Sequence, residues 1–164
     1  MIRYGLRTGL AVLVGLIVAF VLIFGVELYS NVVHPFPVGF TGSMDEVCRH
    51  VESYPGWVLG TVVVAWGLTA ALAAWIAQRI GNVYAATLLG VLLIAAVSLN
   101  VSMLPYPMWF EIAVLVVIAA GAVAGARLAI GRPVSSGHPV SSGHPVSSDP
   151  SAHSSHLSAR PQSE

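Results

Sequence analysis

The chain has 164 residues, of which 56% are hydrophobic and only 9% are charged. Soluble domains carry about 25% charged residues, so this composition excludes a water-soluble globular protein and indicates an integral membrane protein. The formal net charge is zero, and the single cysteine, Cys48, excludes an internal disulfide framework.

Four apolar segments are each long enough to cross a bilayer, since about 20 residues at ~1.5 Å per residue span a hydrocarbon core of ~30 Å. Arg3 and Arg7 precede the first segment as in a signal peptide. That segment is long for a signal peptide and no small-residue cleavage site follows it, so we interpret it as a retained signal anchor. Together the segments predict an all-α, four-helix transmembrane bundle over residues 1–130, with helices at about 8–28, 56–77, 83–104 and 108–130.

Residues 29–55 form a long polar connection, for which we predict a structured outer loop. The segment 34–37 is expected to be extended, because each of its two prolines disfavours helix in the residue before it. Ser43 and Glu46 have the spacing of a capping box. A short helix is therefore predicted from this box to about Ser53, near the membrane surface.

The composition changes at Gly131, and residues 131–164 contain a repeated Pro-Val-Ser-Ser-Gly-His unit. A repeat of this kind cannot bury a core, so we predict a disordered tail. Replication slippage would explain the repeat, and weak binding of a transition metal is the alternative for its histidines, His138, His144, His153 and His156.

The charges are distributed unevenly across the predicted membrane. With the N-terminus in the cytoplasm, Arg49 alone lies outside, and the other arginines lie inside: Arg3, Arg7, Arg79, Arg127, Arg132 and Arg160. The acidic residues before the tail show the reverse pattern, at or beyond the outer face: Glu27, Asp45, Glu46, Glu52 and Glu111. The positive-inside rule therefore predicts that both termini are cytoplasmic. An aromatic belt is expected at the outer interface, formed by Tyr29, Tyr54, Trp57, Tyr106, Trp109 and Phe110.

Small residues recur at four-residue spacing within the apolar segments: Gly5 and Gly9, Gly67 and Ala71, Gly121 and Gly125. Such residues let helix backbones approach closely in lipid. We expect a tight bundle, or association with a second copy or another membrane protein through the face of Gly121 and Gly125. The bilayer is the expected partner, and nucleic acid is not, because the arginines form no patch.

Ionisable residues within a membrane are costly and indicate function, which singles out Glu27 and Glu111. Counted along their helices, these two and Asn100 lie within about one turn of the same outer interface. We therefore predict an outward-facing polar cluster of Glu27, Asn100 and Glu111. The alternative is that the carboxylates reach the lipid headgroups and that Asn100 forms a hydrogen bond between helices.

Paired carboxylates beside a histidine would bind a cation or relay protons. Glu46 and His50 are one helical turn apart, which suits a shared metal or a simple ion pair. The candidate metal ligands are thus Glu27, His34, Glu46, His50 and Glu111.

Sequence signatures of zinc proteases, thiol oxidoreductases, P-loop enzymes and serine hydrolases are absent from the chain, so we predict no catalytic residue and no cofactor. The leading hypothesis is a non-enzymatic structural or accessory membrane subunit. One alternative is a small transporter or cation-binding protein, and another is a membrane enzyme. Both alternatives would use the same side chains: Glu27, His34, Asn100 and Glu111.

Residues 1–130 contain several short patterns: Glu27-x-x-Ser30, His34-Pro35-x-Pro37, Ala65-Trp66 and Leu104-Pro105-Tyr106-Pro107-x-Trp109-Phe110. In these patterns the chain resembles small four-helix bacterial membrane proteins of unknown function. The resemblance implies a multi-pass protein of the bacterial inner membrane, and it implies no activity.

Overall fold

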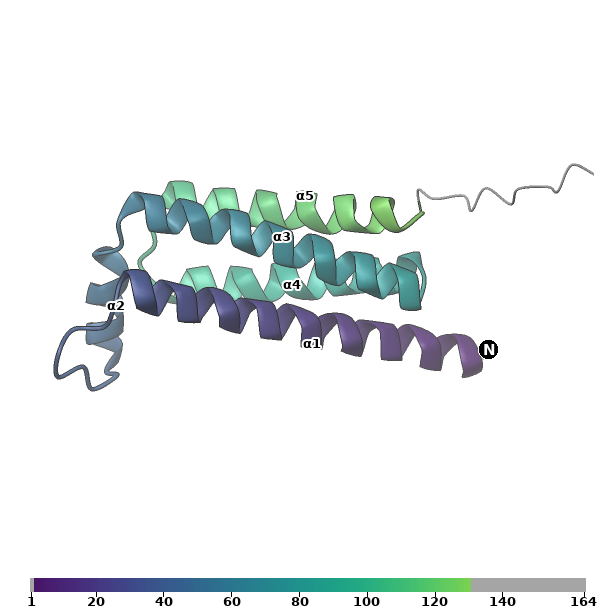
Figure 1. The fold of residues 1–164 in the computed structure, drawn as a ribbon, viewed down its shortest axis with the longest axis horizontal. Helices are drawn as coiled ribbons and strands as arrows, with labels where there is room; N and C mark the ends of the chain where they lie inside the picture. The colour runs from purple at the N-terminus through teal and green to yellow at the C-terminus, as the bar shows by residue number, and fades with distance from the viewer. Residues whose placement is uncertain (1, 131–164) are drawn as a thin grey trace, which may run out of the picture. The chain divides into compact units, whose positions relative to one another are not determined.

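The computed structural model describes residues 2–130, which form five α-helices and, within that range, no strand (Figure 1). Four of the helices are long and apolar enough to cross a membrane, which confirms the predicted all-α fold with four apolar spans. The predicted disordered tail, 131–164, lies outside the described residues. The helices are α1 (Ile2–Val33), α2 (Met44–Glu52), α3 (Gly56–Ile80), α4 (Val83–Met103) and α5 (Met108–Ile130).

The first helix is longer than the sequence predicted, because α1 continues past residue 28 to Val33. No proline or glycine interrupts it between these positions, and Pro35 disfavours helix only from His34 onward. The amide of His34 still donates to the Ser30 carbonyl at 2.8 Å. Glu27 therefore lies about one and a half turns before the end of α1 rather than at its end.

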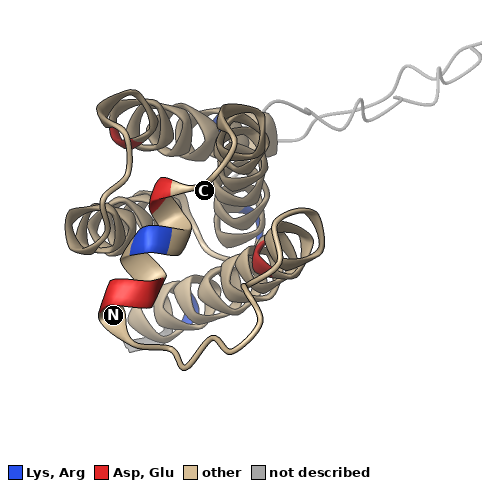
Figure 2. Cartoon of the chain, turned by 90° about the vertical axis from the view of Figure 1, so that its left-hand side faces the viewer, with Lys and Arg blue, Asp and Glu red and all other residues tan. Residues whose placement is uncertain are grey.

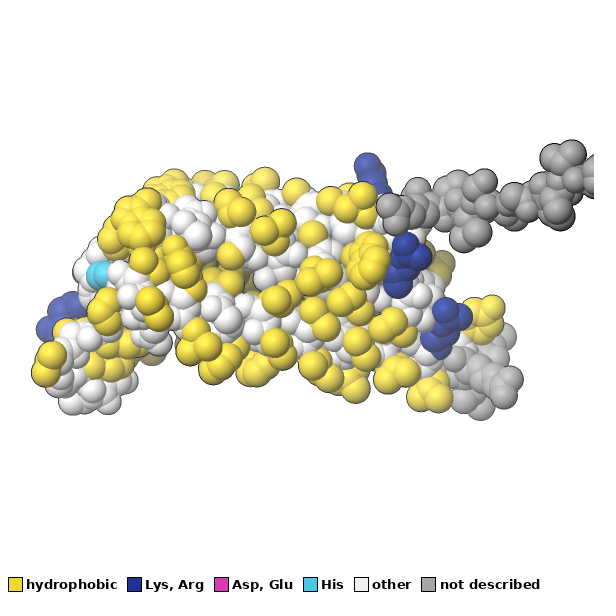
Figure 3. Space-filling model, viewed as in Figure 1, with side chains coloured by type: hydrophobic (Ala, Val, Ile, Leu, Met, Phe, Trp, Pro, Cys, Tyr) yellow, Lys and Arg dark blue, Asp and Glu magenta, His cyan; other side chains and the backbone are white. Residues whose placement is uncertain are grey.

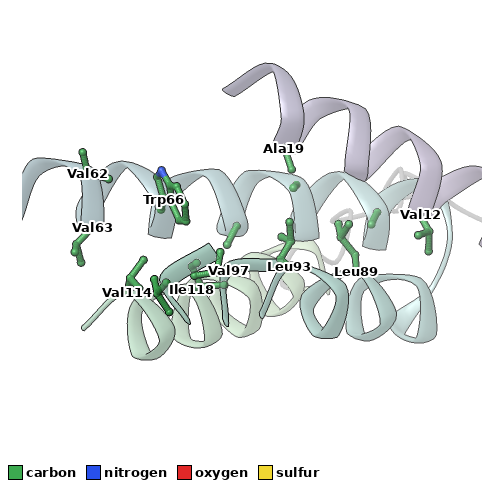
Figure 4. Packing of buried hydrophobic residues seen from close by; sticks show 14 of the residues in the cluster. Val12, Ala19, Val62, Val63, Trp66, Leu89, Leu93, Val97, Val114 and Ile118 are labelled. Atoms are coloured by element: carbon green, nitrogen blue, oxygen red, sulfur yellow. The ribbon is translucent and has the colours of Figure 1, made fainter. Parts of the chain in front are cut away.

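The two central helices of the bundle are α3 and α4. Each packs against the other and against both α1 and α5, whereas α1 and α5 do not pack against each other within the described residues. The core draws apolar side chains from all four long helices, as Figure 4 shows: Val12, Ala19, Val62, Val63, Trp66, Leu89, Leu93, Val97, Val114 and Ile118.

The closest helix pair is α3 with α5, which run in the same direction (Figure 1). A Cβ atom added at Gly121 would collide with the carbonyl oxygen of Gly67, and one added at Gly125 would collide with the carbonyl oxygen of Ala71. Only glycine permits this backbone approach. The face of Gly121 and Gly125, predicted to serve a tight bundle or a partner chain, is thus occupied by α3 of the same chain.

Candidate functional site

The polar connection folds into a cap over one end of the bundle, and we call residues 34–55 the cap. Figure 2 looks onto this end and shows α2 lying across it. Within the described residues, α2 does not pack closely against any of the four long helices. Side chains, rather than close backbone packing, therefore hold α2 in place.

The helix begins at the predicted capping box. The Glu46 amide donates to Ser43 Oγ at 3.4 Å, and the Ser43 amide donates to Glu46 Oε2 at 3.3 Å. The same carboxylate oxygen accepts from the hydroxyl of Thr41 at 2.7 Å and from its amide at 2.9 Å. These hydrogen bonds, chiefly those from Thr41, favour the charged form and lower the pKa of Glu46 to about 2. Glu46 is thus ionised at neutral pH, and its carboxylate accepts hydrogen bonds at the start of α2.

Aromatic rings attach the other end of α2 to the loop. The His50 ring stacks against His34 at 4.6 Å and against Phe36 at 4.3 Å between ring centroids. Phe36 stacks in turn on Phe40 at 4.2 Å, and Tyr54 meets His50 edge-on at 5.2 Å. We call these five residues the ring stack. It joins the residue after α1, the loop and α2 into one unit.

Hydrogen bonds place a proton on Nε2 of His34. The Ser53 hydroxyl donates to the His50 carbonyl oxygen at 2.7 Å, so its single proton is used. His34 Nε2 lies 3.1 Å from the same Ser53 oxygen, which must therefore accept. We assign the Nε2–H tautomer to neutral His34, with Nδ1 left as an acceptor.

The second histidine is buried and lacks one hydrogen bond. His50 is only 7% exposed, and its Nε2 has no partner within the described residues. Burial, and secondarily the charge that His34 would carry, lower the pKa of His50 from its ordinary value of 6.5. His50 is therefore neutral at pH 7.

A cavity of about 330 Å³ opens beside the ring stack, lined by polar and apolar groups that include His34, Phe40, Glu46, Arg49, His50 and Ser53. The structure thus brings three predicted metal ligands, His34, Glu46 and His50, to one place. Their geometry does not suit a metal, since imidazole lone pairs lie in the ring planes and two planes at 22° in a stack do not converge on one ion. Within the described part of the chain, no three ligating side chains form a metal site.

The three side chains of the predicted polar cluster come from three different helices. Glu27 on α1 and Asn100 on α4 are exposed, and Glu111 on α5 is half-buried. No hydrogen bond in residues 2–130 joins these three side chains. The polar cluster of Glu27, Asn100 and Glu111 stays a prediction.

Glu27 instead lies near two tyrosines that sequence reasoning placed only in the aromatic belt. Burial first, and the charge of Glu27 second, raise the pKa of Tyr106 to about 12 and also raise that of Tyr54. These phenols stay protonated at neutral pH. The signal that would have found the site is the set of aromatic residues, Phe36, Phe40 and Tyr54, around the two loop histidines.

Comparisons of the chain with family models, with curated proteins and with solved structures find no match in any of the three.

Proposed function

We propose that the chain is a non-enzymatic accessory membrane subunit. Its four long helices form a solid anchor that presents the cap. The contrast between bundle and cap carries the proposal. The cavity at the centre of the bundle, beside Trp66, Thr69 and Val97, measures about 10 Å³, which is room for no more than one water. The cap has a cavity of about 330 Å³ lined by polar and apolar groups, whereas the larger depressions of the bundle are open on its apolar flank.

The surface supports insertion in a bilayer. Figure 3 shows apolar side chains along the flank of the long helices, with basic side chains gathered near the end opposite the cap and further blue on the cap itself, which carries Arg49. We call the end that carries Arg7, Arg79 and Arg127 the arginine end. The described acidic residues all lie on the cap or on the cap-side parts of α1 and α5.

By the positive-inside rule, the arginine end faces the cytoplasm and the cap faces outward. The resemblance stated above favours the bacterial inner membrane. To test the orientation, Cys48 is replaced by alanine and single cysteines are placed at Val38, which is fully exposed on the cap, or at Ser141. An impermeant thiol reagent is expected to label Val38→Cys in intact cells and Ser141→Cys only after permeabilisation. The reverse pattern overturns the orientation.

The accessory role is tested by photo-crosslinking in native membranes. A photoreactive residue at Val38 on the cap is expected to give one discrete protein adduct. The matched control is the same residue at Val64, which is exposed on the flank of α3 and is expected to react with lipid. A chain that is expressed at normal levels and gives no protein adduct at Val38 contradicts the proposal.

Transport is the alternative that uses Glu27, Asn100 and Glu111. Purified protein reconstituted into liposomes is expected to conduct no Na⁺, K⁺ or protons beyond the leak of empty vesicles. Flux that appears with the wild-type protein and disappears with Glu27→Gln would establish a transporter. Turnover of a substrate that Glu27→Gln abolishes would establish the enzyme alternative instead.

A further inference from the structure

A groove runs between α4 and α5 from the middle of the bundle to the arginine end. Its volume is about 360 Å³, and its walls are mainly apolar and small: Ala86, Gly90, Ala119, Ala122 and Ala126. Arg127 and Ile130 close it at the end of α5. The short side chains leave a depression where larger residues would have filled the space between the two helices.

The length of the groove matches one leaflet of a bilayer. On α4 it extends from Val83 to Ile94, which at ~1.5 Å per residue is roughly 17 Å. Half of a ~30 Å hydrocarbon core is about 15 Å. A groove of this extent, open toward lipid, would accept an acyl chain whose headgroup lies at the arginine end.

Arg127 stands at the mouth of the groove without a polar partner among the described residues. It is exposed and forms no hydrogen bond or ion pair with residues 2–130. The neighbouring arginines are engaged, since Arg7 Nε donates to the Ile80 carbonyl oxygen at 2.7 Å and Arg79 lies 5.3 Å from the centre of the Trp75 ring. No described carboxylate lies at this end of the bundle. Arg127 is therefore a cation with its charge available at the depth of the lipid headgroups.

We propose that this groove binds one anionic phospholipid of the adjacent leaflet, with an acyl chain between α4 and α5 and the phosphate on Arg127. A guanidinium binds phosphate oxygens through two parallel hydrogen bonds, and an anionic headgroup adds attraction to the positive arginine end. Small apolar walls suit a flexible hydrocarbon chain. The inference requires only that the helices lie in a bilayer, so it stands or fails separately from the accessory role of the cap.

A second copy of the chain is a poorer occupant of the groove. Copies in one membrane share one orientation, so the arginine end of a neighbour would face Arg127. That neighbour would bring arginines and no described carboxylate to the guanidinium. A lipid phosphate brings a negative charge to Arg127 instead, and the arginine end of a second copy does not.

A second groove of the same protein serves as a comparison for the groove between α4 and α5. Between α1 and α3 lies a second lipid-facing depression of about 360 Å³, lined by residues that include Leu22, Gly25, Thr61 and Leu68 and by no arginine. It is expected to accept lipid tails without preference for the headgroup. The two grooves thus separate the effect of the guanidinium from the effect of an apolar depression.

The test measures binding of phosphatidylglycerol and phosphatidylcholine to the purified full-length chain by native mass spectrometry. The wild-type protein is expected to bind phosphatidylglycerol more tightly. Arg127→Gln is expected to weaken the binding of phosphatidylglycerol by about fivefold, the factor that one arginine near an anionic surface contributes. The binding of phosphatidylcholine is expected to stay unchanged. The matched control, Arg79→Gln at the same end, is expected to keep the preference.

A second pair of variants fills the grooves from exposed positions. Thr87→Phe, in the groove between α4 and α5, is expected to abolish the preference, whereas Thr61→Phe, in the other groove, is expected to preserve it. A preference retained in Arg127→Gln, or lost equally in Arg79→Gln, overturns the proposal. A dimer that Thr87→Phe converts to a monomer also overturns it, in favour of a second copy. Should Thr87→Phe fail to fold, the surface variant Arg127→Gln still decides the outcome.

Discussion

The imidazole rings of His34 and His50 stack 4.6 Å apart between centroids, with 22° between their planes. Protonation of both rings would place two positive charges face to face, and burial already disfavours the protonation of His50. The attachment of α2 to the rest of the cap therefore depends on a neutral His50. This relationship connects the packing of the cap to the acidity of the medium on its side of the membrane.

Acidification is expected to loosen the cap. The pKa of His50 is lower in the folded cap than the ordinary 6.5, so the unfolded cap binds more protons below about pH 6.5. The stabilisation is present above that pH and is lost as pH falls toward the folded pKa. Hydrogen exchange of α2 amides, corrected for intrinsic rates, is expected to quicken between pH 7.5 and 5.

The Glu46 carboxylate does not explain such a change. Glu46 has a pKa of about 2 and stays ionised throughout this range. The control is His50→Phe, which retains a ring in the stack and removes the titrating group at position 50. Its α2 protection is expected to vary less with pH than that of the wild type, and a wild-type cap that varies no more than the variant contradicts the prediction.

Loss of the capping box is expected to destabilise α2 locally. Ser43→Ala removes the oxygen that accepts from the Glu46 amide, and such a change costs about 1 kcal/mol. Protection of the α2 amides is expected to fall by about fivefold while protection of the core of α3 is unchanged. Asp45→Asn, at a first-turn position that takes no part in the box, is the matched control. Equal loss in α2 and α3 would show instead that the cap and the bundle unfold together.

A methyl group at the α3–α5 contact is expected to weaken the bundle. Gly121→Ala places a Cβ against the Gly67 carbonyl, which is backbone and cannot rotate away, so a loss of about 1–3 kcal/mol is expected. Gly9→Ala is the matched control, since a Cβ at Gly9 meets nothing within 4 Å. Thermal unfolding in detergent measures both variants. Equal stability of the two would mean that α3 and α5 do not approach as closely as described.

Local signals in the sequence predicted local structure well. The spacing of Ser43 and Glu46 was sufficient to place the start of α2, because a capping box involves only neighbouring residues. The glycine face of α5 was also visible as a pattern. Its partner was not, because Gly121 and Gly67 lie on helices separated by α4, and side-by-side packing of α3 with α5 is a property of the whole bundle.

The candidate site was harder to predict than the helices. His34 and His50 were singled out as metal ligands, but sequence spacing does not reveal that the loop returns to stack one ring on the other. The end of α1 was likewise placed too early, because the polar residues after Leu28 suggested an interface where the helix in fact continues. The stacking follows from contacts between residues that are not neighbours in the chain, whereas the end of α1 is set locally by Pro35.

The position of Glu27 can be tested through the two tyrosines it influences. Its negative charge disfavours the phenolate and contributes to the raised pKa of Tyr106, about 12, and of Tyr54. Glu27→Gln is therefore expected to lower both pKa values, although burial will keep that of Tyr106 above 10. NMR of ring-labelled tyrosine, titrated between pH 8 and 12.5 in detergent, measures each phenol separately. Glu111→Gln, which removes a carboxylate from the same end of the bundle, is expected to shift neither. Equal shifts in the two variants would show that the carboxylates act together, and would support the polar cluster predicted from the sequence.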